Sequence, residues 1–263
     1  MTHQARKRFG QNFLQDTRII DDILAHAHPQ AAEHWVEIGP GLGALTQPLL
    51  NRGVQLDVIE LDRDLVVHLQ RQFSGHPRLT IHSADALKFD VGTLTKPGQK
   101  LRVIGNLPYN ISTPLMFHLL ETTRNIEDMH FMLQKEVVAR ICADPGNKQY
   151  GRLSVMMQYF CDTEYLFDVP PESFDPAPKV MSAIVRLVPH QQAPVHLEDF
   201  NVFSHLVTQA FSQRRKTIRN ALKTLLDDSQ ISAMDVDANL RAESVTLQEF
   251  ARLSNHVAKH SSE

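Results

Sequence analysis

The residues from Ile104 to Tyr109, which read I-G-N-L-P-Y, form the stretch of this 263-residue sequence best suited to chemistry on a flat ring. An apolar strand is expected to end at Asn106, and Pro108 fixes its own φ and keeps Leu107 out of the helical region. Asn106, the Leu107 carbonyl and the Tyr109 ring could then project together from one strand end. Such acceptors beside an aromatic ring suit a heterocycle that carries an exocyclic amine. An ordinary strand end followed by a proline turn is the alternative that these residues alone leave open.

A glycine loop, G-P-G-L-G at residues 39–43, follows an earlier predicted strand. Gly39 and Gly41 would let the backbone approach a ligand and adopt unusual φ values. The loop is not a phosphate P-loop, because no Lys-Ser/Thr pair follows it. It is not the dinucleotide motif G-x-G-x-x-G either, because the third glycine comes one residue early.

Two acids follow at the ends of the next two predicted strands. Glu60 lies nineteen residues after Gly41, where a carboxylate can accept both hydroxyls of a ribose. Asp85 ends the third strand and could accept a hydrogen bond from an adenine amine. The alternatives are a surface position of Glu60 beside a helix-capping Asp62 or Asp64, and an Asx turn at Asp85.

Gly39, Glu60, Asp85 and Asn106 therefore end four predicted strands, and in open α/β sheets such ends meet at the ligand-binding edge. Together they predict a nucleoside pocket without a pyrophosphate cradle, and S-adenosylmethionine is the cofactor that matches it best. A nicotinamide-dependent oxidoreductase is the rival on the same kind of sheet. The early third glycine and the N-L-P-Y stretch count against that rival.

The elements that would position these residues alternate along the chain. Strands are predicted at 35–39, 56–61, 79–82, 101–105, 130–133, 165–169 and 182–188, and helices at 19–27, 44–50, 62–73, 113–121 and 135–143. This alternation predicts a parallel α/β sheet with crossover helices, and the short Pro-rich link before the final strand predicts that this strand is antiparallel. Further helices are predicted at 200–211, 214–226 and 247–257. We therefore predict a Rossmann-like catalytic domain at 1–190, which includes a basic N-terminal arm, and a small all-α domain at 191–263.

Composition and cysteine usage narrow the class of protein. The sequence is 42% hydrophobic and 22% charged, which is ordinary for a soluble protein with a sizeable core. No apolar run approaches a membrane span, and the polar, basic start lacks the apolar segment of a secretory signal. Cys142 and Cys161 lack C-x-x-C spacing, and the histidines show no metal-ligand pattern. These features predict a cytoplasmic protein with no membrane partner and no metal.

Basic residues concentrate in two stretches, although the formal net charge is −3. Residues 1–15 and 212–224 contain no acid, and they could form a patch for phosphates or simply two solvated faces. On a helix over 214–226, one face would carry Arg215, Arg219 and Lys223. The next face would carry the apolar residues Ile218, Ala221, Leu222 and Leu225.

Several motifs occur in the order found in one family. They are V-E-I-G-P-G-L-G at 36–43, I-E-L-D at 59–62, D-A at 85–86 and N-L-P-Y-N-I-S-T at 106–113. Flanking motifs extend the match over nearly the whole chain: R-K-R-F-G-Q-N-F-L at 6–14, L-Q-K-E-V-V-A-R at 133–140, Y-G-R-L-S-V at 150–155, F-x-P-x-P-K-V at 174–180 and Q-R-R-K-T-I-R-N at 213–220. The sequence resembles the ribosomal RNA adenine N6-dimethyltransferases, and most closely their bacterial small-subunit branch.

The resemblance implies a class I S-adenosylmethionine-dependent methyltransferase fold and a set of site residues. Cofactor contacts fall on Asn12, Leu14, Gly39, Gly41, Glu60, Asp85 and Asn106. The target base would meet Asn106, Leu107, Pro108 and Tyr109, with Phe174 covering its other face. With an RNA substrate implied, we further predict from their charge that Arg215, Lys216, Arg219 and Lys223 contact RNA phosphates. Ordinary core packing of Phe174 and a hydrophobic staple at Leu14 are the alternatives.

The implied reaction is dimethylation of the N6 amines of two adjacent adenosines in a loop near the 3′ end of 16S rRNA. The implied partner is the small ribosomal subunit or its precursor, whose biogenesis the protein would also aid, and a monomer is expected. Alternatives are a ribosome-assembly factor with secondary catalysis, a large-subunit rRNA dimethylase and a DNA adenine methyltransferase. The last of these would be expected to carry an extended target-recognition insertion.

Overall fold

The computed structural model describes residues 11–96, 98–120, 125–213 and 215–260, in two compact units. Unit 1 comprises Met1–Val138 and Glu164–Pro189, and unit 2 comprises Ala139–Thr163 and His190–Glu263. Residues 1–10 of the predicted basic N-terminal arm lie outside the described residues, and so does Arg214. None of the helices in the described ranges combines the length and apolar character that a membrane span requires.

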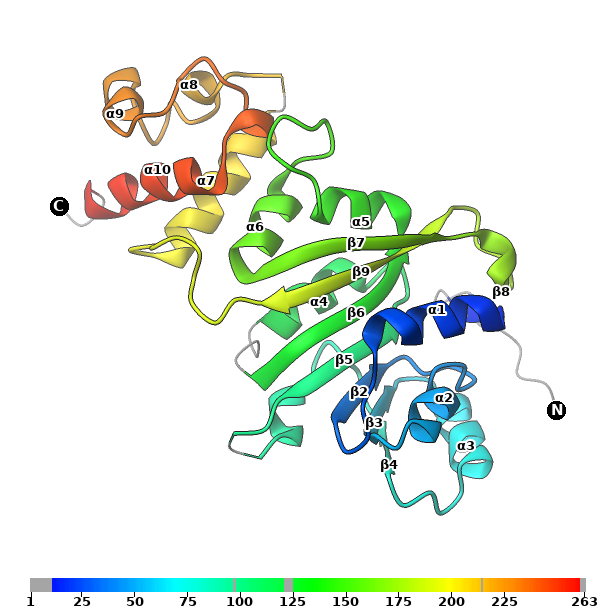
Figure 1. Cartoon of the computed structure of the whole chain (residues 1–263). Coiled ribbons are helices and arrows are strands. Elements are labelled where there is room, and N and C mark those ends of the chain that lie inside the picture. Colours follow the sequence, from blue (N-terminus) through cyan, green and yellow to red (C-terminus); the bar gives the residue numbers. More distant parts are fainter. Residues whose placement is uncertain (1–10, 97, 121–124, 214, 261–263) are drawn as a thin grey trace. The chain divides into compact units, whose positions relative to one another are not determined.

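A seven-stranded sheet with the order β4-β3-β2-β5-β6-β9-β7 is the framework on which the site is built (Figure 1). Its strands are β2 (His34–Ile38), β3 (Gln55–Glu60), β4 (Leu79–Ser83), β5 (Leu101–Asn106), β6 (Ile126–Gln134), β7 (Cys161–Val169) and β9 (Ser182–Pro189). Neighbouring strands from β4 to β6 pair in parallel, and β9 pairs antiparallel with β6. The predicted α/β sheet with an antiparallel last strand is confirmed.

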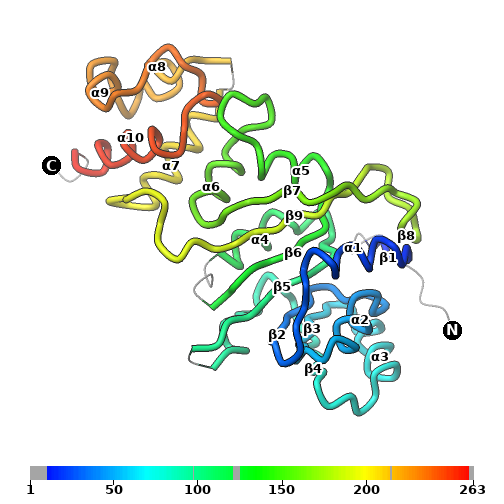
Figure 2. The backbone as a smooth tube through the Cα atoms, in the orientation of Figure 1, coloured from blue at the N-terminus to red at the C-terminus, as the bar shows by residue number. Residues whose placement is uncertain are grey.

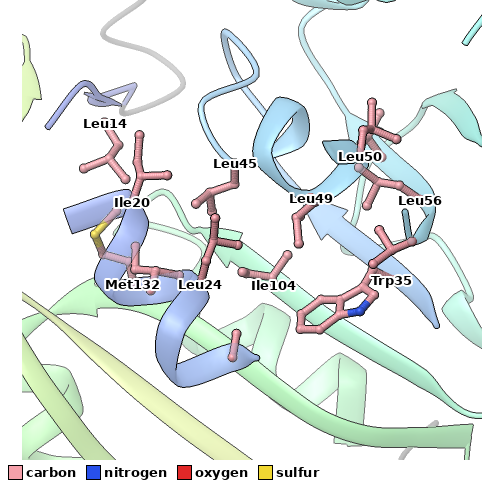
Figure 3. Close-up of a cluster of buried hydrophobic side chains, with 14 of the residues drawn as sticks. Leu14, Ile20, Leu24, Trp35, Leu45, Leu49, Leu50, Leu56, Ile104 and Met132 are labelled. Carbon is pink, nitrogen blue, oxygen red and sulfur yellow. The ribbon is translucent and has the colours of Figure 1, made fainter. Parts of the chain in front are cut away.

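The helices of unit 1 follow the predicted positions within a few residues. They are α1 (Thr17–Ala27), α2 (Thr46–Asn51), α3 (Arg63–Gln72) and α4 (Ser112–Leu120), followed by α5 (Lys135–Ile141) at the boundary of the units. Helix α1 begins where the Asp16 carboxylate accepts a hydrogen bond from the Arg18 N–H, and it ends where His28 adopts a left-handed conformation. Its apolar face buries Ile20 and Leu24 in the core cluster that includes Ile104 of β5 (Figure 3).

Two short strands that the sequence did not predict join distant parts of unit 1. Strand β1 (Phe13–Leu14) pairs antiparallel with β8 (Phe174–Asp175), and Leu14 lies opposite Phe174. The two segments lie side by side although they are far apart in the sequence (Figure 2). Residues 13 and 14 of the N-terminal arm are therefore part of a two-stranded sheet rather than an isolated extension.

Unit 2 consists mainly of helices, and it begins at Ala139, earlier in the chain than residue 191. Its helices include α6 (Arg152–Phe160), α7 (Phe200–Ser212), α8 (Ile218–Ala221), α9 (Asp228–Ala233) and α10 (Leu247–His260). Helix α6, which the sequence did not predict, packs on α7 through rings such as Tyr159 and Phe203, whose centroids lie 5.5 Å apart. This packing explains why residues 139–163 belong with unit 2, a segment that the predicted boundary had placed in the first domain.

The predicted helix over 214–226 is wrong in the residues that the structure describes. Thr217 has an extended backbone and forms a bridge with Arg241, and the Ile218 and Arg219 N–H groups donate to the Leu240 and Ala238 carbonyls. This pairing confines the helix to α8. The apolar side chains of Ile218, Ala221 and Leu222 are buried as expected, but Leu225 is only half-buried. The basic side chains are exposed without forming a stripe along one helix.

Gly105 permits the close approach of β5 and β2 beneath the site. A Cβ built at Gly105 would lie 2.6 Å from the Ile38 carbonyl oxygen, which belongs to the backbone and cannot rotate away. Gly105→Ala is therefore expected to lower the free energy of unfolding by about 2 kcal/mol or more, measured by denaturant titration. Gly151→Ala is the matched control, because its Cβ would meet nothing closer than 3.9 Å. Equal stabilities of the two variants would contradict this account.

Candidate active site

A cavity of about 310 Å³ opens in unit 1 at the carboxyl ends of the parallel strands. Five segments and Leu65 of α3 line it: the arm at 11–14, the strand end and glycine loop at 37–42 and 44–45, the end of β3 at 59–61, the turn after β4 at 84–87, and the turn after β5 at 106–111. The structure thus brings together nearly all the predicted cofactor and base residues: Asn12, Leu14, Gly39, Gly41, Glu60, Asp85, Asn106, Leu107, Pro108 and Tyr109.

The glycine loop lines the cavity and also packs against the N-terminal arm. Gly39 and Gly41 have φ values of 67° and 58°, in the left-handed region that favours glycine. A Cβ on Gly41 would lie 3.0 Å from the Phe13 ring, so glycine allows this ring of the arm to pack directly on the loop. The loop therefore lies between the arm and the end of β3 and contacts both.

Glu60 is a buried carboxylate at this cavity and not a surface cap. Its Oε1 accepts the Asp62 N–H at 2.8 Å and its Oε2 accepts the Gly41 N–H at 3.3 Å. Helix α3 is capped instead by Asp62, whose Oδ1 accepts the Asp64 N–H at 3.1 Å. Burial raises the pKa of Glu60 above its usual value, despite the two backbone donors. Each oxygen retains lone-pair capacity for a ribose hydroxyl.

Asp85 both forms an Asx turn and lines the cavity, the two roles that its sequence position allowed. Its Oδ1 accepts the Leu87 N–H at 3.0 Å, which is the geometry of an Asx turn. The same residue lines the cavity together with its neighbours Ala84 and Ala86. The turn thus orients a carboxylate at the wall of the site.

Asn106 is held in one orientation by the arm. Its Nδ2 donates to the Asn12 carbonyl oxygen at 2.9 Å. Only the amide nitrogen can donate to a carbonyl, so Oδ1 is the atom left to accept a hydrogen bond from a ligand amine. The following residue is tied to the sheet, because the Leu107 N–H donates to the Met132 carbonyl at 3.2 Å.

Phe174 is not brought to the cavity. Its side chain is only 5% exposed and belongs to the core cluster that contains Leu14 and Ile20, and it is not among the lining residues. The expected role of Phe174 as a cover for the second face of a base therefore has no support in this geometry. The physical reason is the β1–β8 pairing, which turns this ring into the core.

Glu37 is a site residue that the sequence analysis missed. It lies on β2, lines the cavity and is 2% exposed, and its Oε2 accepts the Thr46 hydroxyl at 2.6 Å. Burial raises the pKa of this carboxyl to about 8, and the neighbouring charge of Glu60 acts in the same direction. An acid inside an otherwise apolar strand was the signal that could have revealed it.

Arrangements suited to a metal ion are not found in the part of the chain that the structure describes. The groups that line the cavity instead fit a nucleoside-bearing cofactor. They are a glycine loop, a buried carboxylate at the end of β3 and a second carboxylate after β4. With the strand order and the antiparallel β9, this site defines a class I S-adenosylmethionine-dependent methyltransferase.

Comparison with known proteins identifies the family. The family described as ribosomal RNA adenine dimethylase matches residues 2–259, and the chain belongs to it. The chain is therefore an enzyme that methylates ribosomal RNA adenine, and S-adenosylmethionine is its methyl donor.

Individual relatives are similar over nearly their whole lengths. A protein of Pseudomonas putida named ribosomal RNA small subunit methyltransferase A is 56% identical over 97% of this chain and 96% of its own. A protein of Chromohalobacter salexigens with the same name is 55% identical over 98% of this chain and 93% of its own. Among solved structures, the 23S rRNA methyltransferase ErmE is 26% identical, with a TM-score of 0.75 over 94% of this chain and 100% of its own. A dimethyladenosine transferase from Plasmodium falciparum, 24% identical, shares the fold with a TM-score of 0.78 over 95% of this chain and 98% of its own.

Proposed function

We propose that this enzyme dimethylates the N6 amines of two adjacent adenosines in a loop near the 3′ end of 16S rRNA, and that it thereby aids biogenesis of the small ribosomal subunit. The small-subunit assignment rests on the relatives that are 55–56% identical over nearly their whole lengths. The chemistry rests on one observation above all. The Asn106 amide is oriented by the Asn12 carbonyl at the edge of the same cavity that contains Glu60 and Asp85.

The chain's own residues would position and polarise the target amine. When bound, S-adenosylmethionine supplies a methyl group that its sulfonium already activates. Asn106 Oδ1 and the Leu107 carbonyl would accept the two N6 hydrogens, which favours a pyramidal, more nucleophilic nitrogen and stabilises the positive charge that develops on it. Tyr109 would stack on the base. The methylated, cationic amine is strongly acidic and would lose its proton to water, so a dedicated general base is not required.

Dimethylation and access to the base set further conditions. After the first transfer, N6 keeps one hydrogen, so either Asn106 or the Leu107 carbonyl loses its partner. The target adenosine must also leave its stack to reach the cavity, which is easier in a single-stranded loop than in a duplex. This requirement supports an RNA loop rather than duplex DNA as the substrate.

The substrate is tested with ribosomal particles. The purified enzyme and labelled S-adenosylmethionine are incubated with undermethylated small subunits, fully methylated small subunits and large subunits. Label is expected in the undermethylated small subunits alone. Equal labelling of large subunits would refute the small-subunit assignment while leaving the chemistry intact. We further propose a monomeric, cytoplasmic enzyme. Cys142 and Cys161 form no disulfide, as a reducing compartment favours, and light scattering tests the oligomeric state.

The exposed basic residues of unit 2 are proposed to contact rRNA phosphates. Arg215, Lys216 and Lys223 are exposed, whereas Arg219 forms an ion pair with Asp228 at 2.9 Å and is partly neutralised. Replacing Arg215, Lys216 and Lys223 with Glu is therefore expected to weaken binding to small subunits by about tenfold or more at low salt. It should also reduce the slope of log Kd against log salt by about 2.

The control for this prediction is a charge reversal elsewhere. Lys100 is exposed in unit 1, outside the basic stretch, and Lys100→Glu should change neither affinity nor slope appreciably. Unchanged binding of the triple variant in a titration series from low to high salt would remove unit 2 from the RNA interface.

A further inference from the structure

The turn that carries Tyr109 is fastened to the sheet at more than one point. Residues 107–111 connect β5 to α4. At the start of this turn the Leu107 N–H donates to the Met132 carbonyl of β6, and at its end the Ser112 hydroxyl donates to the Tyr109 carbonyl at 3.2 Å. A third contact holds the side chain itself, since the Tyr109 hydroxyl and the Ser182 hydroxyl lie 2.7 Å apart. The ring is therefore tethered at both ends, by its backbone and by its hydroxyl.

Ser182 is a rigid anchor for that hydroxyl. It is fully buried, it is the first residue of β9, and it lies opposite Gln134 of β6 in the antiparallel ladder. The preceding residue is tied down as well, because the Met181 carbonyl accepts the Lys135 N–H at 3.0 Å. Ser182 does not line the cavity, so it can influence a ligand there only through Tyr109.

We propose that Ser182 is a positioning residue for methyl transfer, which fixes the plane of the Tyr109 ring against which the target adenine stacks. The proposal rests on the stacking role given to Tyr109 in the proposed function. A tyrosine ring has two side-chain torsions, and a hydrogen bond at its far end restrains both of them. Since transfer needs N6 in line with the methyl group, a tilt of the stacking surface reduces the productive fraction of bound bases. Burial raises the pKa of the Tyr109 hydroxyl, so it remains protonated and the tether persists over the working pH range.

A double-mutant cycle tests the proposal. Ser182→Ala and Tyr109→Phe each remove one hydroxyl of the pair while keeping the backbone and the ring. Each is expected to lower kcat for methyl transfer by about three- to tenfold, the worth of one neutral hydrogen bond, with the Kd for S-adenosylmethionine unchanged. The double variant is expected to match either single variant, because both changes break the same contact. Ser173→Ala is the matched control. It also removes a serine hydroxyl from a buried residue of unit 1, but the partner of that hydroxyl is Asp16 Oδ2, at 3.4 Å, and not Tyr109.

The free energy of unfolding provides a second cycle that does not depend on activity. Tyr109→Phe leaves the Ser182 hydroxyl buried without its partner, so adding Ser182→Ala to it should recover stability rather than lower it further. Additive effects in both cycles, or a Ser182→Ala variant with wild-type kcat, would overturn the inference. These outcomes differ from a failure of the proposed function, which would appear as wild-type enzyme that leaves rRNA adenine unmethylated or as Tyr109→Ala with wild-type kcat.

Discussion

Replacing Asn106 with Ala is expected to lower kcat for methyl transfer to undermethylated small subunits by about 100- to 1,000-fold. The variant loses the Oδ1 acceptor that would polarise the N6 amine, and the Leu107 carbonyl alone cannot hold both hydrogens. It also loses the donor to the Asn12 carbonyl, so affinity for S-adenosylmethionine should fall by a smaller factor, about tenfold or less. Single-turnover methyl transfer at saturating cofactor separates the two effects.

Asn110 supplies the matched control for this prediction. It is also an asparagine that lines the cavity, four residues further along the same turn, and it is exposed. Asn110→Ala should keep kcat within about threefold of the wild type. This change in kcat is smaller than the change expected from losing a typical hydrogen bond to a reacting group. An Asn106→Ala variant that retains comparable activity would remove this side chain from the chemistry.

Replacing Glu37 with Gln is expected to stabilise the unliganded protein at neutral and alkaline pH. The pKa of Glu37 is raised to about 8, against a usual value of 4.5. Below about pH 4.5 the carboxyl is protonated in both the folded and unfolded states. Between pH 4.5 and 8 the folded state binds one more proton, so the wild type loses stability as pH rises through this window. Gln does not titrate, and it can still accept the Thr46 hydroxyl, so the variant's advantage should grow to the order of 3 kcal/mol by pH 8.

Glu33 provides a control with the opposite sign. Burial raises its pKa, but hydrogen bonds from Gln30, Trp35 and Arg102 outweigh burial and hold the pKa below its usual value. Glu33 therefore contributes stability above the unfolded pKa, and Glu33→Gln should destabilise the protein at neutral pH. Denaturant titrations at pH 5, 6, 7 and 8 measure both variants. Parallel pH profiles for Glu37→Gln and the wild type would contradict the buried, protonated state of Glu37.

The part of the site that follows from strand order was predictable. Alternating strands and helices fix a parallel sheet, and a parallel sheet brings its carboxyl ends to one edge. Gly39, Glu60, Asp85 and Asn106 could therefore be placed together from their positions in the sequence alone. Residues whose role depends on a partner far away in the sequence could not be predicted in this way. Ser182 is separated from Tyr109 by 73 positions, and the significance of its hydroxyl exists only in the folded sheet.

Contacts between residues far apart in the sequence also explain the other predictions that differ from the structure. The pattern at 214–226 is amphipathic, but bonds from Ile218 and Arg219 to residues 240 and 238 replace most of the expected helix. Phe174 follows the family motif, yet pairing of β8 with β1 places it in the core. Local pattern thus predicted the elements and the site edge, while long-range backbone pairing decided which side chains reach the cavity.

The central claim is that this chain adds two methyl groups to N6 of adenosines in small-subunit rRNA. It is tested most directly by incubating the enzyme and labelled S-adenosylmethionine with undermethylated small subunits, digesting the 16S rRNA and identifying the labelled nucleoside and its position. We expect N6,N6-dimethyladenosine at two adjacent positions near the 3′ end, and its loss in the Asn106→Ala variant. Label on cytosine, at another adenine position, or absent from the RNA would contradict the claim.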